Sequence, residues 1–422
     1  MNKVAATLFA FVAAVASTQG QALSAATDLS PAARRVGEAR NEIREKPAQY
    51  AGYSLLASAL IDRARETSNG NYYAQAEDAV KKSLELAPNN FDTEKIRVSL
   101  LLAEHEFPAA LDAAKTLNQR VPDDVMVYGL LTDANVELGN YKDAETSAQW
   151  MLNLRPGNLP ALIRAARLRE LFGDAEGSYE LMDLAYQSTS PTDSEQRASI
   201  LVQMGHLRFV SGNLEAAEKL LQQALVISPG DSVALGNLAQ IRIAQTHYPE
   251  AVALLQRRYQ SAPRAGNLYE LAEASQLAGR EAEAKKSFEE FEAKAMLETN
   301  KKDNSNRELI FYYADHARQP AKALNLARQE LAWRHDVYTL DAYAWALHVN
   351  GQNAEARKQI ESALAVGIRD AKLFLHAGEI TLVLHDVPAA ERYLKQAADL
   401  NSPDSEQART MLAGMATMPA QR

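Results

Sequence analysis

The sequence contains no cysteine, and this absence excludes several kinds of chemistry at once. Disulfide bonds, thiolate metal ligands, cysteine nucleophiles and a lipid-modified cysteine behind a leader all require this residue. Aromatic residues make up only 7% of the chain, and the 19 glycines and 15 prolines are scattered over 422 residues. Alanine, leucine, glutamate, glutamine and arginine dominate instead, which is the composition of an all-α protein.

The chain also lacks any long run of lysine or arginine, and its 54 acidic residues outnumber its 45 basic ones, for a formal charge of -9. Because a phosphate backbone requires a basic surface, we expect no nucleic-acid partner. No phosphate-binding loop, dinucleotide fingerprint or nucleophile elbow occurs, and His105-Glu106 lacks the second histidine of a zinc protease helix. We therefore expect a protein that is not an enzyme and that needs no cofactor or metal.

Long apolar runs are missing everywhere except at the first residues, which have the layout of a signal peptide. Lys3 precedes an apolar run over residues 4–16, and residues 17–22 are small or polar. We expect cleavage after Gly20 or at the end of this segment, with residues 1–22 as the signal peptide and a periplasmic or secreted location. An uncleaved anchor is disfavoured because the run is shorter than the ~20 residues that span a bilayer. We expect no membrane insertion after cleavage.

The strongest pattern in the rest of the sequence is a period of 34 residues. Prolines mark it at Pro88, Pro122 and Pro156, and again at Pro229 and Pro263. Each period consists of two amphipathic segments, separated by a turn and ended by the proline. Small residues such as Gly205 in a first segment and Ala217 in a second are expected to let the two helix backbones approach closely.

This period, the small residues and the terminal proline resemble the tetratricopeptide repeat family. The resemblance covers about Tyr50 to Pro403 and implies a right-handed superhelical α-solenoid of about ten helix–turn–helix units. The run from Tyr312 to Gln352 also looks like a group of exported bacterial repeat proteins of unknown function. The expected units begin near Tyr53, Phe91, Val125, Leu159, Ala198, Ser232, Ala265, Arg307, Val337 and Ala371.

Interruptions of the period predict how the chain is divided. The polar stretch from Lys301 to Asn306 indicates a hinge, although simple tolerance of loop insertions is the alternative. After the signal peptide, the expected segments are a lead-in over 23–46, a front block of about seven units over 47–292, an extended helix and hinge over 293–306, a back block of about three units over 307–403, and a capping helix and tail over 404–422.

The resemblance implies that the first helix of each unit lines a concave groove. The groove residues carried onto this chain are Tyr312, Asp315, His316, Tyr338, Asp341, Trp345 and His348 in the back block, with Tyr269 and His206 in the middle. Aromatic side chains beside Asp and His are the usual composition of a recognition surface. We therefore predict a non-catalytic scaffold or adaptor that binds a peptide or protein partner. The sequence leaves open the identity of the partner and the oligomeric state of the protein itself.

Other readings of the same residues remain open. Asp315 and His316 are equally well explained by an internal hydrogen bond, and Trp345 by packing between repeats. A zinc or nickel site from His316, Asp341 and His348 is conceivable, but its spacing is not diagnostic. At the level of function, the alternatives are a periplasmic carrier of a small ligand or metal, an enzyme that uses groove carboxylates, and self-association through the end repeats.

Overall fold

The computed structural model describes residues 30–67, 69–299 and 304–416, and this part of the chain contains helices and no strand. The expected signal peptide, residues 1–22, lies outside the described residues. None of the described helices has the length and apolar character needed to cross a membrane. The all-α class predicted from composition is confirmed.

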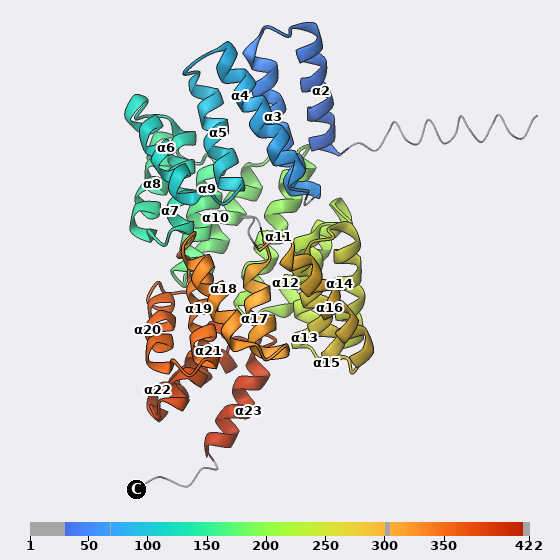
Figure 1. Ribbon diagram of the computed structural model, residues 1–422, viewed down its shortest axis with the longest axis vertical. Coiled ribbons are helices and arrows are strands. Elements are labelled where there is room, and N and C mark those ends of the chain that lie inside the picture. The colour runs from blue at the N-terminus through green and yellow to red at the C-terminus, as the bar shows by residue number, and fades with distance from the viewer. Residues whose placement is uncertain (1–29, 68, 300–303, 417–422) are drawn as a thin grey trace, which may run out of the picture. The chain divides into compact units, whose positions relative to one another are not determined.

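The described helices follow one another as ten pairs, preceded by α2 (Pro31–Glu45) and followed by α23 (Ser405–Ala416) (Figure 1). The pairs are α3 (Tyr50–Thr67) with α4 (Asn71–Leu86), α5 (Phe91–Ala103) with α6 (Phe107–Arg120), α7 (Val125–Glu137) with α8 (Tyr141–Leu154), α9 (Leu159–Leu171) with α10 (Ala175–Ser188), α11 (Ser194–Val210) with α12 (Leu214–Ile227), α13 (Ser232–Ala244) with α14 (Tyr248–Ser261), α15 (Ala265–Leu277) with α16 (Glu281–Met296), α17 (Asn306–Phe311) and its continuation η1 (Tyr312–His316) with α18 (Pro320–Leu331), α19 (Val337–Val349) with α20 (Asn353–Leu364), and α21 (Ala371–Val383) with α22 (Val387–Ala398). The predicted ten-unit solenoid is confirmed, and the first helices begin within four residues of the predicted starts.

The chain divides into two compact units, residues 1–100 and 101–422, and the boundary falls inside α5. In the first unit, α3 and α4 pack through small and aliphatic side chains such as Ala57, Leu60 and Val80. The predicted hinge at 293–306 lies within the second unit and is described only in part. The repeats on both sides of it therefore belong to the same compact unit.

A residue in the left-handed backbone conformation ends the first helix of nine repeats among the described residues. Glycine occupies five of these turns, and the nine positions are His105, Gly139, Gly173, Gly212, Thr246, Gly279, Arg318, Gly351 and His385. At the Gly139 turn, backbone N–H groups donate to carbonyl oxygens of the preceding helix; Asn140 N, for example, donates to Asn135 O at 2.8 Å. The positive φ angle required at these turns therefore explains why glycine recurs there in the 34-residue period.

The close helix approach predicted at Gly205 is present. A Cβ atom added to Gly205 would lie 2.7 Å from Leu221 Cγ, and Ala217 is fully buried beside it. We expect Gly205→Ala to lower the free energy of unfolding by about 1–3 kcal/mol, because the new methyl group forces α11 and α12 apart.

A matched change at Gly37 separates this packing effect from helix propensity. Gly37 also lies inside a helix, but nothing surrounds its Cβ position within 4 Å. Gly37→Ala should therefore stabilise its helix by about 0.5–1 kcal/mol. Chemical denaturation of both variants checks the pair, and equal changes at the two sites would show that the backbones in α11 and α12 do not need the glycine.

In the second unit, turns within early repeats contact loops between late repeats, and we call these contacts the seam. They join Gly139 to His335, Gly173 to Gly367, and Gly212 to Asn401. His335 N donates to Glu137 O at 3.0 Å, and Val337 N donates to the Tyr141 hydroxyl at 3.0 Å. The solenoid of this unit therefore winds back on itself until its late repeats touch its early ones.

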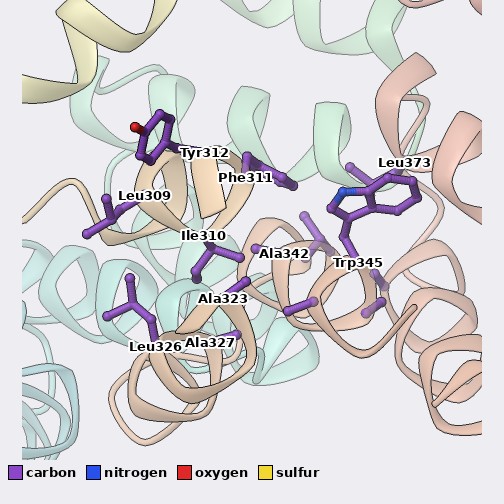
Figure 2. Packing of buried hydrophobic residues seen from close by; sticks show 14 of the residues in the cluster. Leu309, Ile310, Phe311, Tyr312, Ala323, Leu326, Ala327, Ala342, Trp345 and Leu373 are labelled. Carbon is purple, nitrogen blue, oxygen red and sulfur yellow. The ribbon is translucent and has the colours of Figure 1, made fainter. Parts of the chain in front are cut away.

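The core follows the same arrangement. One cluster of buried side chains combines Val136 and Leu168 from early repeats with Leu309, Trp345 and others from late repeats. Figure 2 shows the part of this cluster where side chains of α17, α18 and α19 pack together. Burial of this apolar surface drives the contact between early and late repeats.

A central cavity lined by first helices

The second unit forms an open cavity of about 1070 Å³, which we call the central cavity. Its walls come from the first helices α13, α15, α17, α19 and α21, together with residues 401–409 at the start of α23. Second helices contribute only at their margins, through Leu214 and Tyr248. The concave side of the repeats, which the resemblance assigned to the first helices, is thus the side that holds the cavity.

One wall is built around the carboxylate of Glu273. The Tyr269 hydroxyl donates to its Oε1 at 2.7 Å, and His316 Nε2 lies 3.7 Å from the same oxygen. Burial opposes ionisation of Glu273, but the nearby His316 imidazole and the charge of Lys372 hold its pKa below the ordinary value. Burial also raises the pKa of Tyr269 well above its usual range, so that its hydroxyl keeps the proton it donates.

A π-helical turn places His316 in this wall. The five residues of η1 widen the helix after α17, and Ala317 N donates to Tyr312 O at 2.8 Å, five residues back. The His316 ring then lies against Phe288, with 4.3 Å between ring centroids. A regular α-helix would aim this imidazole in a different direction, because each residue turns the helix by about 100°.

Three further lining residues occupy the same position in three successive first helices. Arg307, Tyr338 and Lys372 are each the second residue of α17, α19 and α21. The Arg307 guanidinium lies over the Tyr338 ring at 5.5 Å, and Lys372 Nζ lies over the Phe311 ring at 3.9 Å. The sequence prediction named Tyr338 but missed Arg307 and Lys372. Applying the 34-residue period to Tyr338 leads directly to Lys372, and this signal was available.

Carboxylates are the commonest charged groups in the cavity walls. Seven of them line it against three permanent cations, an excess of four; the carboxylates are Glu270, Glu273, Glu308, Asp341, Asp370, Asp404 and Glu406, and the cations are Arg307, Lys372 and Arg409. Burial raises the pKa of the carboxyl groups of Glu270, Asp370 and Asp404. Glu270 is already paired with Arg258, whereas Asp370 and Asp404 have no ion-pair partner among the described residues, so a bound cation would offset the cost of removing these two groups from water.

Four of the nine predicted groove residues line the central cavity. They are Tyr269, His316, Tyr338 and Asp341. The other five do not border it and are held by neighbours: Tyr312 donates to Glu292 at 3.2 Å, Trp345 Nε1 donates to Asp315 at 2.8 Å, His348 Nδ1 is 2.7 Å from Asn353 Oδ1, and His206 Nε2 is 2.8 Å from Glu170 Oε1. A role in binding stays a prediction for all nine.

A buried polar stack forms around His376 of α21. His376 Nδ1 is 2.7 Å from Asp341 Oδ1, and the Trp345 ring stacks on the His376 imidazole with centroids 4.2 Å apart. Trp345 and Asp315 thus make the internal contacts that were the alternative to a groove role for these residues. Burial lowers the pKa of the neighbouring His348, which favours its neutral form.

The residues of the conceivable metal site are engaged separately. His316 faces Glu273, Asp341 faces His376, and His348 faces Asn353. Within the described ranges, no group of three or more His, Cys, Asp or Glu side chains is arranged to hold a metal ion.

Comparison with known proteins gives a family match within the second unit. The tetratricopeptide repeat model matches residues 210–265. No curated protein matches the chain.

Solved structures resemble the chain at low sequence identity. A structure of the human IFIT1 dimer with m7Gppp-AAAA is 15% identical, with 91% of this chain and 88% of that chain covered and a TM-score of 0.50. The APC/C hetero-tetramer Cut9–Hcn1 is 14% identical over 77% of this chain, with a TM-score of 0.47, and the match spans only 55% of that chain. A tetratricopeptide repeat protein from Parabacteroides merdae is 14% identical over 56% of this chain and 93% of that chain, with a TM-score of 0.42. Identities this low indicate a shared fold and nothing more.

Proposed function

We propose that this chain, which is a tetratricopeptide-repeat protein, binds a segment of polypeptide in the central cavity and does not catalyse a reaction. Repeats of this kind are typical of protein-interaction scaffolds, in which each unit contacts its neighbours and presents a concave surface. The observation that carries the proposal is the cavity itself. Its walls combine the rings of Phe311 and Tyr338 with charged groups from the four first helices α15, α17, α19 and α21.

These walls suit a polypeptide because they offer three kinds of contact within one space. Phe311 and Tyr338 present ring faces, and Gln240 and Gln276 present amides that both donate and accept hydrogen bonds. The third kind of contact comes from the charged side chains that also line the cavity. A volume of about 1070 Å³ is at the upper end of the range for small-molecule sites, which favours several residues of a chain over a single small ligand.

Nucleic acid is a poorer fit, although the similar human structure was solved with a capped oligonucleotide. The excess of carboxylates over cations in the central cavity would repel phosphate groups. We also propose that the protein acts outside the cytoplasm, on the signal-peptide pattern of residues 1–22, which N-terminal sequencing of the mature protein tests.

The test of peptide binding uses the same substitution inside and outside the cavity. Random phage-displayed peptides are selected on the wild-type protein, and the affinity of the selected peptides is measured by calorimetry. Gln276, an exposed residue of α15, lines the cavity, whereas the exposed Gln256 of α14 does not. We expect Gln276→Trp to weaken binding roughly tenfold, because the indole occupies space that the peptide needs.

Gln256→Trp is the matched control and should leave the affinity unchanged. Thermal unfolding of both variants shows that the fold is kept. Peptides that bind wild type and Gln276→Trp equally well would place the binding surface outside the central cavity. Failure to select any peptide would contradict the proposal itself.

A further inference from the structure

We infer that the polypeptide segment received by the central cavity carries basic side chains, lysine or arginine, and that the carboxylates of the walls recognise them. This inference rests on the proposed function and specifies its partner. Its basis is the placement of charge in the cavity, where seven carboxylates face three permanent cations.

The first step concerns the cavity's own cations, which leave carboxylates uncompensated. Lys372 Nζ lies on the Phe311 ring, and among the described residues it has no carboxylate oxygen within 4.0 Å. Arg307 lies over Tyr338 and pairs only with the adjacent Glu308, at 3.5 Å. Neither cation forms an ion pair with the carboxylates of the remaining walls.

The second step concerns two aspartates at neighbouring helix starts. Asp370 accepts hydrogen bonds from the backbone N–H groups of Lys372 and Leu373, at 2.9 and 3.1 Å, and no side-chain cation neutralises it. Asp404 has no ion-pair partner within 4.0 Å in the described part of the chain. Two carboxylates therefore line the cavity with their charge available to a ligand.

The third step is the effect of this charge on the cavity's titrating groups. Burial lowers the pKa of Lys372, but the carboxylates of Glu273, Asp404 and Asp341 more than reverse this and leave its pKa raised. The pKa of Arg307 is likewise raised against burial, first by Glu308 and then by Asp336. A negative potential acts on both cations, and it would act on a ligand's basic groups in the same way.

The walls also supply suitable surfaces for such groups. The rings of Phe311 and Tyr338 already carry an ammonium and a guanidinium group, at 3.9 and 5.5 Å. A basic side chain of the ligand would therefore compete with Lys372 and Arg307 for these rings, while the carboxylates accept its hydrogen bonds. An acidic segment, by contrast, would meet the excess of carboxylates.

The experiment uses two substitutions in the same cavity that should act in opposite directions. An array of random peptides graded in net charge is screened on the full-length protein, and the affinities of the bound peptides are measured for wild type, Asp404→Asn and Lys372→Gln. We expect basic peptides to bind. We expect Asp404→Asn to weaken them roughly tenfold and Lys372→Gln to tighten them roughly threefold, with all affinities falling as salt rises.

The possible outcomes separate this inference from the function on which it rests. Binding of acidic peptides, with the effects of the two substitutions reversed, would overturn the basic partner and keep the peptide-binding function. If peptides of no charge class bind, both the basic partner and the peptide-binding function are contradicted. Basic peptides whose affinity neither substitution changes would show that the cavity carboxylates do not recognise them. Both substitutions keep the size of the side chain, and circular dichroism verifies that each variant is folded.

Discussion

Replacing Gly212 and Asn401 by cysteine is expected to produce a disulfide that forms spontaneously in air and strongly stabilises the second unit. A Cβ atom built on Gly212 lies 3.9 Å from Asn401 Cβ, and the Cβ atoms of disulfides are about 3.5–4.5 Å apart. The bond would close a loop that spans the repeats between the two positions. Chain-entropy reasoning for a loop of this length gives about 5 kcal/mol, since the cross-link restricts the unfolded chain.

The comparison is made within the double variant, oxidised against reduced. Gly212 and Asn401 both have positive φ angles, 78° and 50°, so two cysteines strain the backbone equally in both redox states. Because the natural sequence has no cysteine, no other thiol competes. We expect the thermal midpoint of the oxidised form to exceed that of the reduced form by about 10 °C or more. Failure to form the bond under mild oxidation would show that this part of the seam is not closed in solution.

Gly173→Ala should be the most damaging single change in the seam. Gly173 has φ +81°, which alanine adopts only under strain, and a Cβ atom there would collide with the carbonyl oxygen of Gly367. Gly367 has the reciprocal restriction, because its own Cβ atom would lie 2.8 Å from Phe172 O. Backbone atoms on both sides leave no flexible side chain to move away. We expect a loss of about 3 kcal/mol in the free energy of unfolding, measured by chemical denaturation.

Gly351→Ala is the matched control for the backbone strain. Gly351 ends a first helix in the same left-handed conformation, at φ +74°, but nothing lies within 4 Å of its Cβ position. The control should lose about 1 kcal/mol, the cost of the conformation alone. The difference between the two variants measures the contact between early and late repeats. Equal losses would mean that Gly173 is needed only for the backbone conformation of its own turn and that its contact with Gly367 adds no stability.

The seam also bears on the central cavity. Asn401 belongs to both, since it contacts the turn at Gly212 and lines the cavity wall. Residues in the range 401–409 line the same cavity as α13 and α15 because the late repeats return to this position. A variant that opens the seam should therefore alter binding as well as stability, and the stapled protein provides the reference state for such measurements.

Much of the fold follows from local sequence patterns. Repeat units were predicted to begin near Val125, Leu159, Ser232, Ala265 and Ala371, and a first helix begins at each of these residues. The period of 34 encodes this alternation of helix-forming segments and turns. The close approach of α11 and α12 at Gly205 and Ala217 was also predicted, since two helices joined by a short turn pack at their small residues. These features depend only on neighbouring segments of the chain.

The cavity was predictable in its location and less so in its residues. First helices were expected to line it, and Tyr269, His316, Tyr338 and Asp341 do so. Trp345 was expected in the groove because the family resemblance assigns its position in the first helix to the concave face. It is instead only 8% exposed, since its ring stacks on His376, which comes from the next repeat. Helical periodicity identifies a face, but it does not determine which part of that face a neighbouring helix covers.

The sequence by itself determined the helices, their pairing within repeats and the turns between them, and the family resemblance added the side of each repeat that faces inward. These properties arise from interactions within a repeat or between adjacent repeats, and such interactions leave a periodic signature. Only the tertiary structure decided that Gly173 meets Gly367, that the π-helical turn directs His316 to Glu273, and that carboxylates from distant repeats line one cavity. Small rotations between successive repeats add up along the solenoid, and their sum, which no single repeat encodes, sets which distant residues meet.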